Sequence, residues 1–166
     1  MADPNQSDPW LPADSAAEFE PSFVDVYREL QASLVRLACA LTGSEALAQD
    51  LVHDAFIRAH ARWERIEHPR TYLRVAVVNA CRSASRRAKR ERSADALFVV
   101  EDATLEADEM FDALSSLPYR QRAALVLQYY EGLTQAEIAE ILRCREGTVA
   151  SLVHRGLAQL RRVIDQ

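Results

Sequence analysis

The sequence of 166 residues is poor in several residue types. Aromatic residues make up 7% and glycine occurs four times, whereas β-sandwiches and barrels need aromatic strands and many tight turns. The three cysteines, Cys39, Cys81 and Cys144, lie far apart, which is typical of buried thiols and excludes a disulfide framework. No apolar run approaches the roughly 20 residues that cross a bilayer. Positions 1–25 also lack the basic start and apolar stretch of a signal peptide. We therefore expect a cytoplasmic protein without membrane insertion.

Motifs of catalysis and metal binding are also missing. The sequence has no glycine-rich phosphate loop, no nucleophile elbow and no HExxH pair. His53 and His60 lie seven residues apart, and no cysteine stands near them at metal-ligand spacing. We therefore expect no enzymatic activity, no cofactor and no bound metal.

Charge is plentiful, and it is arranged in blocks. The net charge of −5 combines two acidic segments without a base, 1–25 and 95–112, with two segments of net positive charge, 26–94 and 113–166. The densest basic cluster comprises Arg82, Arg86, Arg87, Lys89, Arg90 and Arg92. Cations also favour a helix C-terminus, but six bases in eleven residues exceed what capping needs. The cluster therefore indicates a polyanionic partner such as nucleic acid.

Apolar residues at spacings of three and four predict helices along most of the chain. A first helix is expected from Pro21 to Gly43, and a second from its cap at Ser44 to about Trp63. A third extends through 72–84 into the basic cluster. Three helices with short connections predict a small helical bundle.

The C-terminal part predicts a helix-turn-helix. A capping box, Thr134-Gln-Ala-Glu137, opens a short helix over 134–142, which is followed by a turn at 143–146 and a longer helix over 147–164. A plain pair of packed helices would need only the apolar stripes. The small residue at the helix crossing, Ala139, and the polar outer face of the second helix favour DNA binding.

Four motifs follow one another in a fixed order. They are AQDLVHDAF at 48–56, PRTYLRVAVVN at 69–79 followed by Arg86-Arg87, LPYRQR at 117–122, and TQAEIAEILRCREGTV at 134–149. They resemble the AxDLVQExF segment, the aromatic-Leu…Asn…Arg-Arg stretch, the LPxxxR motif and the EIAxxL…GTV helix-turn-helix of bacterial sigma factors of the extracytoplasmic-function (ECF) type. Each motif is short, and the ordered set carries the resemblance.

The resemblance implies an all-α protein of two small domains, a sigma-2-like helical bundle at 20–92 and a sigma-4-like helix-turn-helix domain at 111–166. A flexible acidic leader at 1–19 precedes them, and an acidic linker at 93–110 joins them. The implied function is to direct core RNA polymerase to specific promoters and to assist promoter opening, with no catalysis of its own. The implied partners are core RNA polymerase, promoter DNA in double-stranded and melted form, and an anti-sigma factor.

Carried over residue by residue, the resemblance implies three sites. The core-polymerase site comprises Asp50, Leu51, Asp54, Phe56, Ile57 and Arg58. The minus-ten DNA site comprises Arg62, Arg65, His68, Arg70, Tyr72, Asn79, Arg82, Arg86 and Arg87. The minus-thirty-five DNA site comprises Arg143, Arg145, Thr148, Ala150, Ser151, His154 and Arg155. The turn departs from the family pattern, since Arg143 and Arg145 stand where Gly and Ser are usual.

Two other functions remain open at this point. A sigma-like decoy or interaction protein would bind polymerase or a regulator without binding DNA. A one-domain helix-turn-helix transcriptional regulator would need a ligand pocket or a dimer interface in the first half. The acidic leader also suggests a hypothesis of its own, in which it folds back on the basic cluster and weakens DNA binding.

Overall fold

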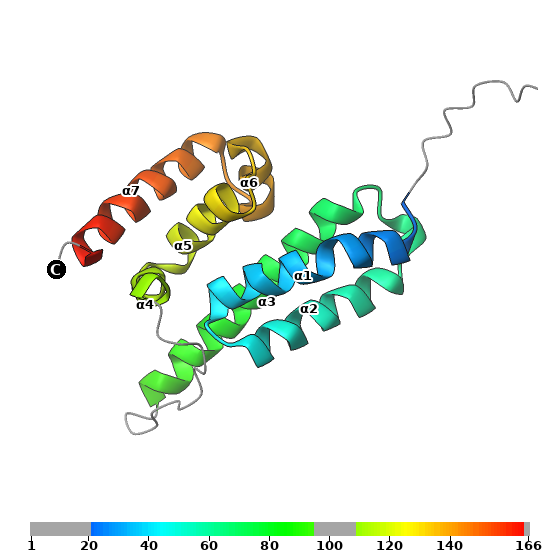
Figure 1. The fold of residues 1–166 in the computed structure, drawn as a ribbon, viewed down its shortest axis with the longest axis horizontal. Helices are drawn as coiled ribbons and strands as arrows, with labels where there is room; N and C mark the ends of the chain where they lie inside the picture. Colours follow the sequence, from blue (N-terminus) through cyan, green and yellow to red (C-terminus); the bar gives the residue numbers. More distant parts are fainter. Residues whose placement is uncertain (1–20, 95–108, 165–166) are drawn as a thin grey trace, which may run out of the picture.

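The computed structural model describes residues 21–94 and 109–164, and all regular structure within these two ranges is helical. The first range forms a bundle of three helices, α1 (Phe23–Thr42), α2 (Glu45–His60) and α3 (Pro69–Ala94), with a short 3-10 turn, η1 (Trp63–Arg65), before α3 (Figure 1). The fold class predicted from the sequence is confirmed. The leader at 1–19 and most of the linker lie outside the described residues.

The second range forms a C-terminal group of helices that lies along one side of the bundle (Figure 1). Its elements are α4 (Glu109–Ser115), α5 (Tyr119–Leu125), a π-helical turn η2 (Val126–Tyr130), α6 (Gln135–Leu142) and α7 (Glu146–Ile164). The sequence did not predict α4. Nor did it predict the π-helical turn η2.

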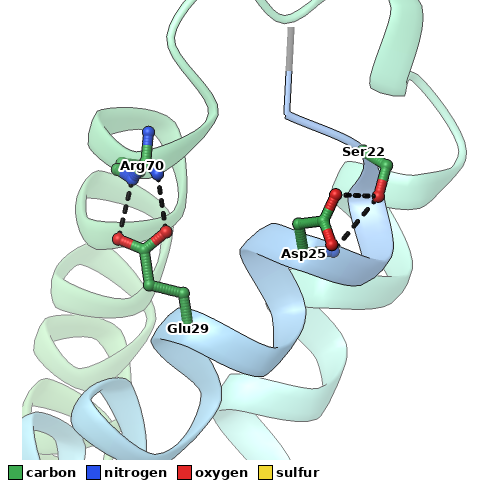
Figure 2. A network of polar contacts seen from close by, with 4 residues as sticks. All are labelled: Ser22, Asp25, Glu29 and Arg70. Atoms are coloured by element: carbon green, nitrogen blue, oxygen red, sulfur yellow. Dashed lines mark hydrogen bonds and ion pairs between the residues drawn. The ribbon is translucent and has the colours of Figure 1, made fainter. Parts of the chain in front are cut away.

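Capping residues set the ends of α1. The hydroxyl of Ser22 accepts a hydrogen bond from the backbone N–H of Asp25 at 3.2 Å, which satisfies one free donor of the first turn (Figure 2). Gly43 ends the helix at φ 79°, a left-handed conformation that glycine adopts without strain, and its N–H donates to the carbonyl of Cys39 at 2.8 Å.

A cluster of aromatic side chains packs the start of α1 against the end of α2. The ring of Phe23 lies 6.1 Å from Phe56, 4.7 Å from His60 and 5.1 Å from Trp63, each in an edge-to-face arrangement. Tyr27 packs on Phe56 as well, at 4.8 Å. Because Trp63 belongs to η1, this cluster also holds the connection between α2 and α3 in place.

The apolar stripes match the buried face with two exceptions. Leu34, Leu37 and Leu41 on α1 are fully buried, as their spacing predicts. Leu47 and Tyr27, which stand at the same helical spacing as buried residues of α2 and α1, are 38% and 39% exposed. Tyr27 still packs on Phe56 of α2 with one side of its ring.

The C-terminal helices pack closely around α7. Gly156 allows α5 to approach, since a Cβ there would lie 2.8 Å from Cδ1 of Leu125. The capping box at the start of α6 forms as predicted: Glu137 N–H donates to the Thr134 hydroxyl at 3.3 Å, and Thr134 N–H donates to the Glu137 carboxylate at 2.8 Å. The glycine thus fits α5 against α7, and the capping box holds the first turn of α6.

Candidate nucleic-acid interface

A cleft of about 950 Å³ collects most of the residues predicted to contact the minus-ten element. Its walls include Arg62, Arg65 and His68 from the α2–α3 connection and Tyr72 and Asn79 from α3. Guanidinium groups pair with phosphates, an aromatic ring stacks on an unpaired base, and an amide can hydrogen-bond a base edge. The cleft therefore has the side-chain types needed to hold a single nucleic-acid strand.

The α2–α3 connection is held by its own backbone. Arg65 N–H donates to the carbonyl of Arg62 at 2.9 Å, and Ile66 N–H donates to that of Trp63 at 3.0 Å. Ile66 and Trp63 are half-buried against the core of the bundle. Their burial leaves the polar residues of the connection, Arg62 and Arg65 among them, exposed to solvent.

Arg70 does not line this cleft. Its guanidinium binds both carboxylate oxygens of Glu29 on α1, at 2.9 and 2.6 Å (Figure 2). This charge-assisted hydrogen bond lowers the pKa of Glu29 and raises the pKa of Arg70. Both side chains are 48% exposed, so the pair contributes about 0–1 kcal/mol and chiefly aligns α1 with α3.

The basic cluster continues from the cleft along α3. Tyr72, Asn79 and Arg86 are spaced by seven residues, so they lie on nearly the same face of the helix. At about 1.5 Å rise per residue, Arg86 lies about 10 Å beyond Asn79. Arg87 points elsewhere and donates to Glu91 at 2.8 Å, while Arg82 is half-buried. Arg82, Arg86 and Arg87 therefore differ in their surroundings: the first is half-buried, the second is exposed, and the third is paired with Glu91.

The helix-turn-helix presents a polar outer face. Of the residues predicted to contact the minus-thirty-five element, Thr148 is half-buried and the others are exposed. The hydroxyl of Ser151 donates to the carbonyl of Gly147 at 2.9 Å, and Nε of Arg155 donates to that of Ser151 at 3.2 Å. The polar side chains of α7 therefore lie along its surface, with a small residue, Ala150, between them.

The turn before α7 is built on a strained residue. Arg143 ends α6 at φ 50° and ψ 58°, in the left-handed region that favours glycine. The carbonyl of Arg145 accepts the first hydrogen bonds of α7, from the N–H groups of Thr148 and Val149 at 2.9 and 3.2 Å. Both arginines are exposed, so each guanidinium is available to a phosphate.

Sequence reasoning missed Arg120, which supports the turn from α5. Its Nη2 donates to the carbonyl of Leu142 at 3.2 Å, so it satisfies a free acceptor at the end of α6. The LPYRQR motif contains this residue, but its partner lies 22 positions further along the chain. Spacing along the sequence carries no signal of such a contact.

The residues predicted to bind core polymerase lie on α2, and one of them is not accessible. Asp50, Asp54, Ile57 and Arg58 are exposed, and Leu51 is half-buried. Asp54 and Arg58 form an ion pair at 3.8 Å one helical turn apart. Phe56 is only 2% exposed, because it belongs to the aromatic cluster. The expectation that its side chain contacts a partner directly is therefore corrected, since Phe56 supports the surface from beneath.

Two further properties concern the whole of the described chain. No helix within residues 21–94 and 109–164 is long and apolar enough to cross a membrane. In the same two ranges, no group of histidine, cysteine and acidic side chains is arranged to hold a metal ion.

Comparisons with family sequence profiles match both halves of the chain. Residues 26–91 match Sigma-70 region 2, and residues 107–160 match Sigma-70 region 4. The first match covers the bundle that carries the cleft, and the second covers the helix-turn-helix. A one-domain regulator would leave the first match unexplained.

Curated relatives match over most of their length. The chain is 35% identical to an RNA polymerase sigma-E factor of Streptomyces antibioticus over 155 residues, covering 86% of this chain and 84% of that protein. It is 32% identical to the ECF RNA polymerase sigma factor SigM of Mycobacterium tuberculosis over 167 residues, covering 96% of this chain and 85% of SigM.

The fold also matches a solved structure. The sigma factor RpoE of Bartonella quintana, solved in complex with the anti-sigma factor NepR, superimposes with a TM-score of 0.70 at 26% identity, covering 85% of this chain and 97% of RpoE. Profiles, relatives and fold agree with the motifs read from the sequence. The chain belongs to the ECF-type RNA polymerase sigma factors, which are non-enzymatic factors of transcription initiation.

Proposed function

We propose that the N-terminal domain binds the minus-ten promoter element through the residues that the α2–α3 connection and α3 contribute to the cleft, and that α7 reads the minus-thirty-five element. The observation that carries the proposal is the meeting of Arg62, Arg65, Tyr72 and Asn79 in one cleft, although the sequence spreads them over 18 positions. This arrangement supports capture of a melted strand, in addition to general attraction to duplex DNA.

Promoter opening follows from the chemistry of the cleft. Taking a base out of the stack costs a few kcal/mol. The ring of Tyr72 offsets this cost by stacking, which contributes about 1–3 kcal/mol per base, and Asn79 offers a hydrogen-bonding amide. Arg62 and Arg65 hold the phosphates on either side. The expected result is a bound single strand at the minus-ten element.

Reading of the minus-thirty-five element uses the exposed face of α7. The major groove of B-form DNA is about 12 Å wide and admits an α-helix. Ser151 and His154 present hydrogen-bonding groups to base edges, and Ala150 presents a methyl group. Arg143 and Arg145 in the turn reach the phosphate backbone, which sets the register of the helix.

The outer face of α2 is the proposed binding surface for core polymerase. It combines charged groups, Asp50, Asp54 and Arg58, with an apolar side chain, Ile57, that is 54% exposed. An exposed apolar residue within a ring of charges is typical of protein interfaces. We place the protein in the cytoplasm, where core polymerase acts, and propose an anti-sigma factor as a further partner, as RpoE has NepR.

The test is transcription with purified bacterial core polymerase on a pooled library of promoter fragments. Transcripts that depend on the added protein support the proposal, and their start sites give both promoter elements. Association with core without transcripts supports the decoy hypothesis instead. Absence of association contradicts the binding surface on α2.

A matched pair of variants tests the cleft itself. Arg62→Ala removes a guanidinium from the cleft, whereas Arg28→Ala makes the same charge change at an exposed site on α1. On a promoter from the library, permanganate reactivity of melted thymines should fall about tenfold with Arg62→Ala and stay unchanged with Arg28→Ala. Equal reactivity in the two variants contradicts the assignment of the cleft.

A further inference from the structure

The start of α7 carries an acidic side chain that none of the three predicted sites includes. Glu146 is the first residue of the helix, and it is exposed. Arg143 and Arg145, in the turn just before it, are exposed as well. Within the described ranges Glu146 forms no ion pair, with these arginines or with any other cation. Its carboxylate is therefore available to a ligand.

Glu146 begins a row of side chains along α7. Ala150 and His154 follow at intervals of four residues, and both are exposed. Residues four apart lie on the same side of an α-helix, about 6 Å from one another along its axis. Val149 and Val153 are buried and pack into the core. The row therefore lies on the side of α7 that is open to DNA.

The first turn of such a helix is the part that comes closest to the bases. In helix-turn-helix proteins the second helix lies in the major groove, with its N-terminal residues against base edges. Gly147 follows Glu146, and nothing in the described chain lies within 4 Å of the place where a Cβ of Gly147 would stand. The groove can therefore approach the helix closely beside the carboxylate.

A carboxylate in this position restricts which base can face it. An ionised carboxylate only accepts hydrogen bonds. In the major groove guanine presents two acceptors, N7 and O6, and thymine presents the acceptor O4. Adenine has an amino group but places its acceptor N7 beside it, whereas the N4 amino group of cytosine is a donor that suits glutamate. Cytosine is therefore the base that fits Glu146.

We propose that Glu146 is a specificity-determining residue of α7, which selects cytosine in the minus-thirty-five element by accepting a hydrogen bond from the N4 amino group. Opposite guanine or thymine the carboxylate loses water and gains no donor, so binding weakens. Arg143 and Arg145 offset the repulsion between this acid and the DNA backbone by binding phosphates. The inference rests on the proposed reading of the minus-thirty-five element by α7.

Selection of promoter fragments tests the assignment. Fragments with a randomised minus-thirty-five region are bound by core polymerase loaded with the full chain, and the bound fragments are sequenced. The wild type should prefer cytosine at one position by about fivefold. Glu146→Ala should lose this preference and keep those at other positions. Glu146→Gln should shift it to adenine, whose N6 and N7 groups match a side-chain amide.

Glu45 provides the matched control. It is an exposed glutamate at the first position of α2, so Glu45→Ala and Glu45→Gln make the same changes at the same place in a helix. An acid in the first turn also complements the helix dipole. A purely structural role for Glu146 thus predicts a loss of stability in both alanine variants, measured by urea denaturation, and an unchanged base preference in both.

Affinities for two defined fragments separate base discrimination from general binding. One fragment carries the selected cytosine, and the other carries thymine at that position. The wild type should bind the first about fivefold more tightly, and Glu146→Ala should bind the two alike. This variant should also bind the thymine fragment more tightly than the wild type does, because its side chain no longer repels the base and the nearby phosphates. High salt should reduce that gain.

Two results would overturn the inference. One is a wild-type selection without a cytosine preference at any position of the minus-thirty-five region, and the other is a cytosine preference that Glu146→Ala leaves intact at every position. A wild-type protein that selects no fragments contradicts the proposed function, and the inference falls with it. Fragments selected without dependence on Glu146 contradict the inference alone, so the two failures are distinguishable.

Discussion

Adjacent residues on α2 differ sharply in burial. Phe56 is buried against Phe23 and Tyr27, whereas Ile57 is 54% exposed one position further on. Successive residues of a helix point about 100° apart, so one turn can serve the core and a partner together. Burial assigns Phe56 to stability, and exposure leaves Ile57 available for the proposed contact with core polymerase.

Alanine substitutions should separate these two roles. Phe56→Ala should lower the free energy of unfolding by about 3–5 kcal/mol, because a buried aromatic ring leaves a cavity. Ile57→Ala should change stability by less than about 0.5 kcal/mol and weaken association with core polymerase. Urea denaturation and a core-binding titration measure the two effects. A stable Phe56→Ala protein with impaired core binding would reverse the assignment.

Arg143 is a residue whose backbone and side chain have conflicting requirements. A left-handed conformation costs a non-glycine residue on the order of 1 kcal/mol or more, and glycine is usual at this position in the family. Arginine at this position provides an exposed guanidinium, which glycine would not.

Relief of this strain should reduce function. Arg143→Gly should raise the free energy of unfolding by about 1 kcal/mol and weaken binding to promoter DNA through loss of a phosphate contact. Arg143→Lys keeps both the charge and the strain, so it should leave stability unchanged and preserve most of the affinity. If Arg143→Gly bound DNA as well as wild type, the side chain would have no part in the interface.

At the scale of elements, the stability of α6 comes from its caps and its packing, because the helix is too short to be stable by itself. It has only eight residues, and isolated helices of this length do not form in water. The capping box satisfies the first donors, Arg120 satisfies an acceptor at the other end, and Ile138 and Ile141 are buried on α6. Placement of the recognition helix α7 depends on these contacts, since α6 packs directly against it.

Removal of the capping hydroxyl should destabilise the C-terminal domain. Thr134→Ala should cost about 1 kcal/mol, and Thr134→Ser, which keeps the hydroxyl, should cost little. Hydrogen bonds from Thr134 lower the pKa of Glu137, so the contribution of this carboxylate is present above its unfolded pKa and is lost as pH falls through the folded value. Unfolding of wild type and Thr134→Ala across the acid range measures both effects. A cost of Thr134→Ala that grows towards low pH would contradict the capping role.

At the scale of the whole molecule, the net charge of −5 conceals a basic surface. The acids gather at 1–25 and 95–112, mostly outside the described residues, while α3 carries the basic cluster beyond the cleft. Attraction to DNA depends on the local potential of the surface that meets it. A protein with an acidic isoelectric point can therefore bind a polyanion.

The salt dependence of DNA binding should report this surface. Each phosphate contact contributes about −0.9 to the slope of log affinity against log salt. Arg86→Ala should reduce the magnitude of that slope by about 1, and Arg28→Ala, on another helix, should leave it unchanged. The measurement is fluorescence anisotropy of a promoter duplex over a salt series. Equal slopes for the two variants would remove Arg86 from the DNA surface.

Local patterns in the sequence were sufficient to predict several helices and their caps. The spacing of apolar residues predicted α1 and α3, and Gly43 and the Thr134–Glu137 box marked helix ends, because these features depend on contacts within one or two turns. The ordered motifs identified the family for the same reason, since each is a local pattern. The predictions were less accurate at margins, as Leu47 shows.

Tertiary structure alone decided which residues act together. It buried Phe56, gave Arg70 a partner in Glu29, and joined Arg120 to Leu142 and Tyr119 to Val78. It also brought five of the residues predicted to contact the minus-ten element into one cleft that the helix-turn-helix shares. Such contacts join positions far apart in the chain, and their energies depend on distances and burial that exist only after the helices have packed.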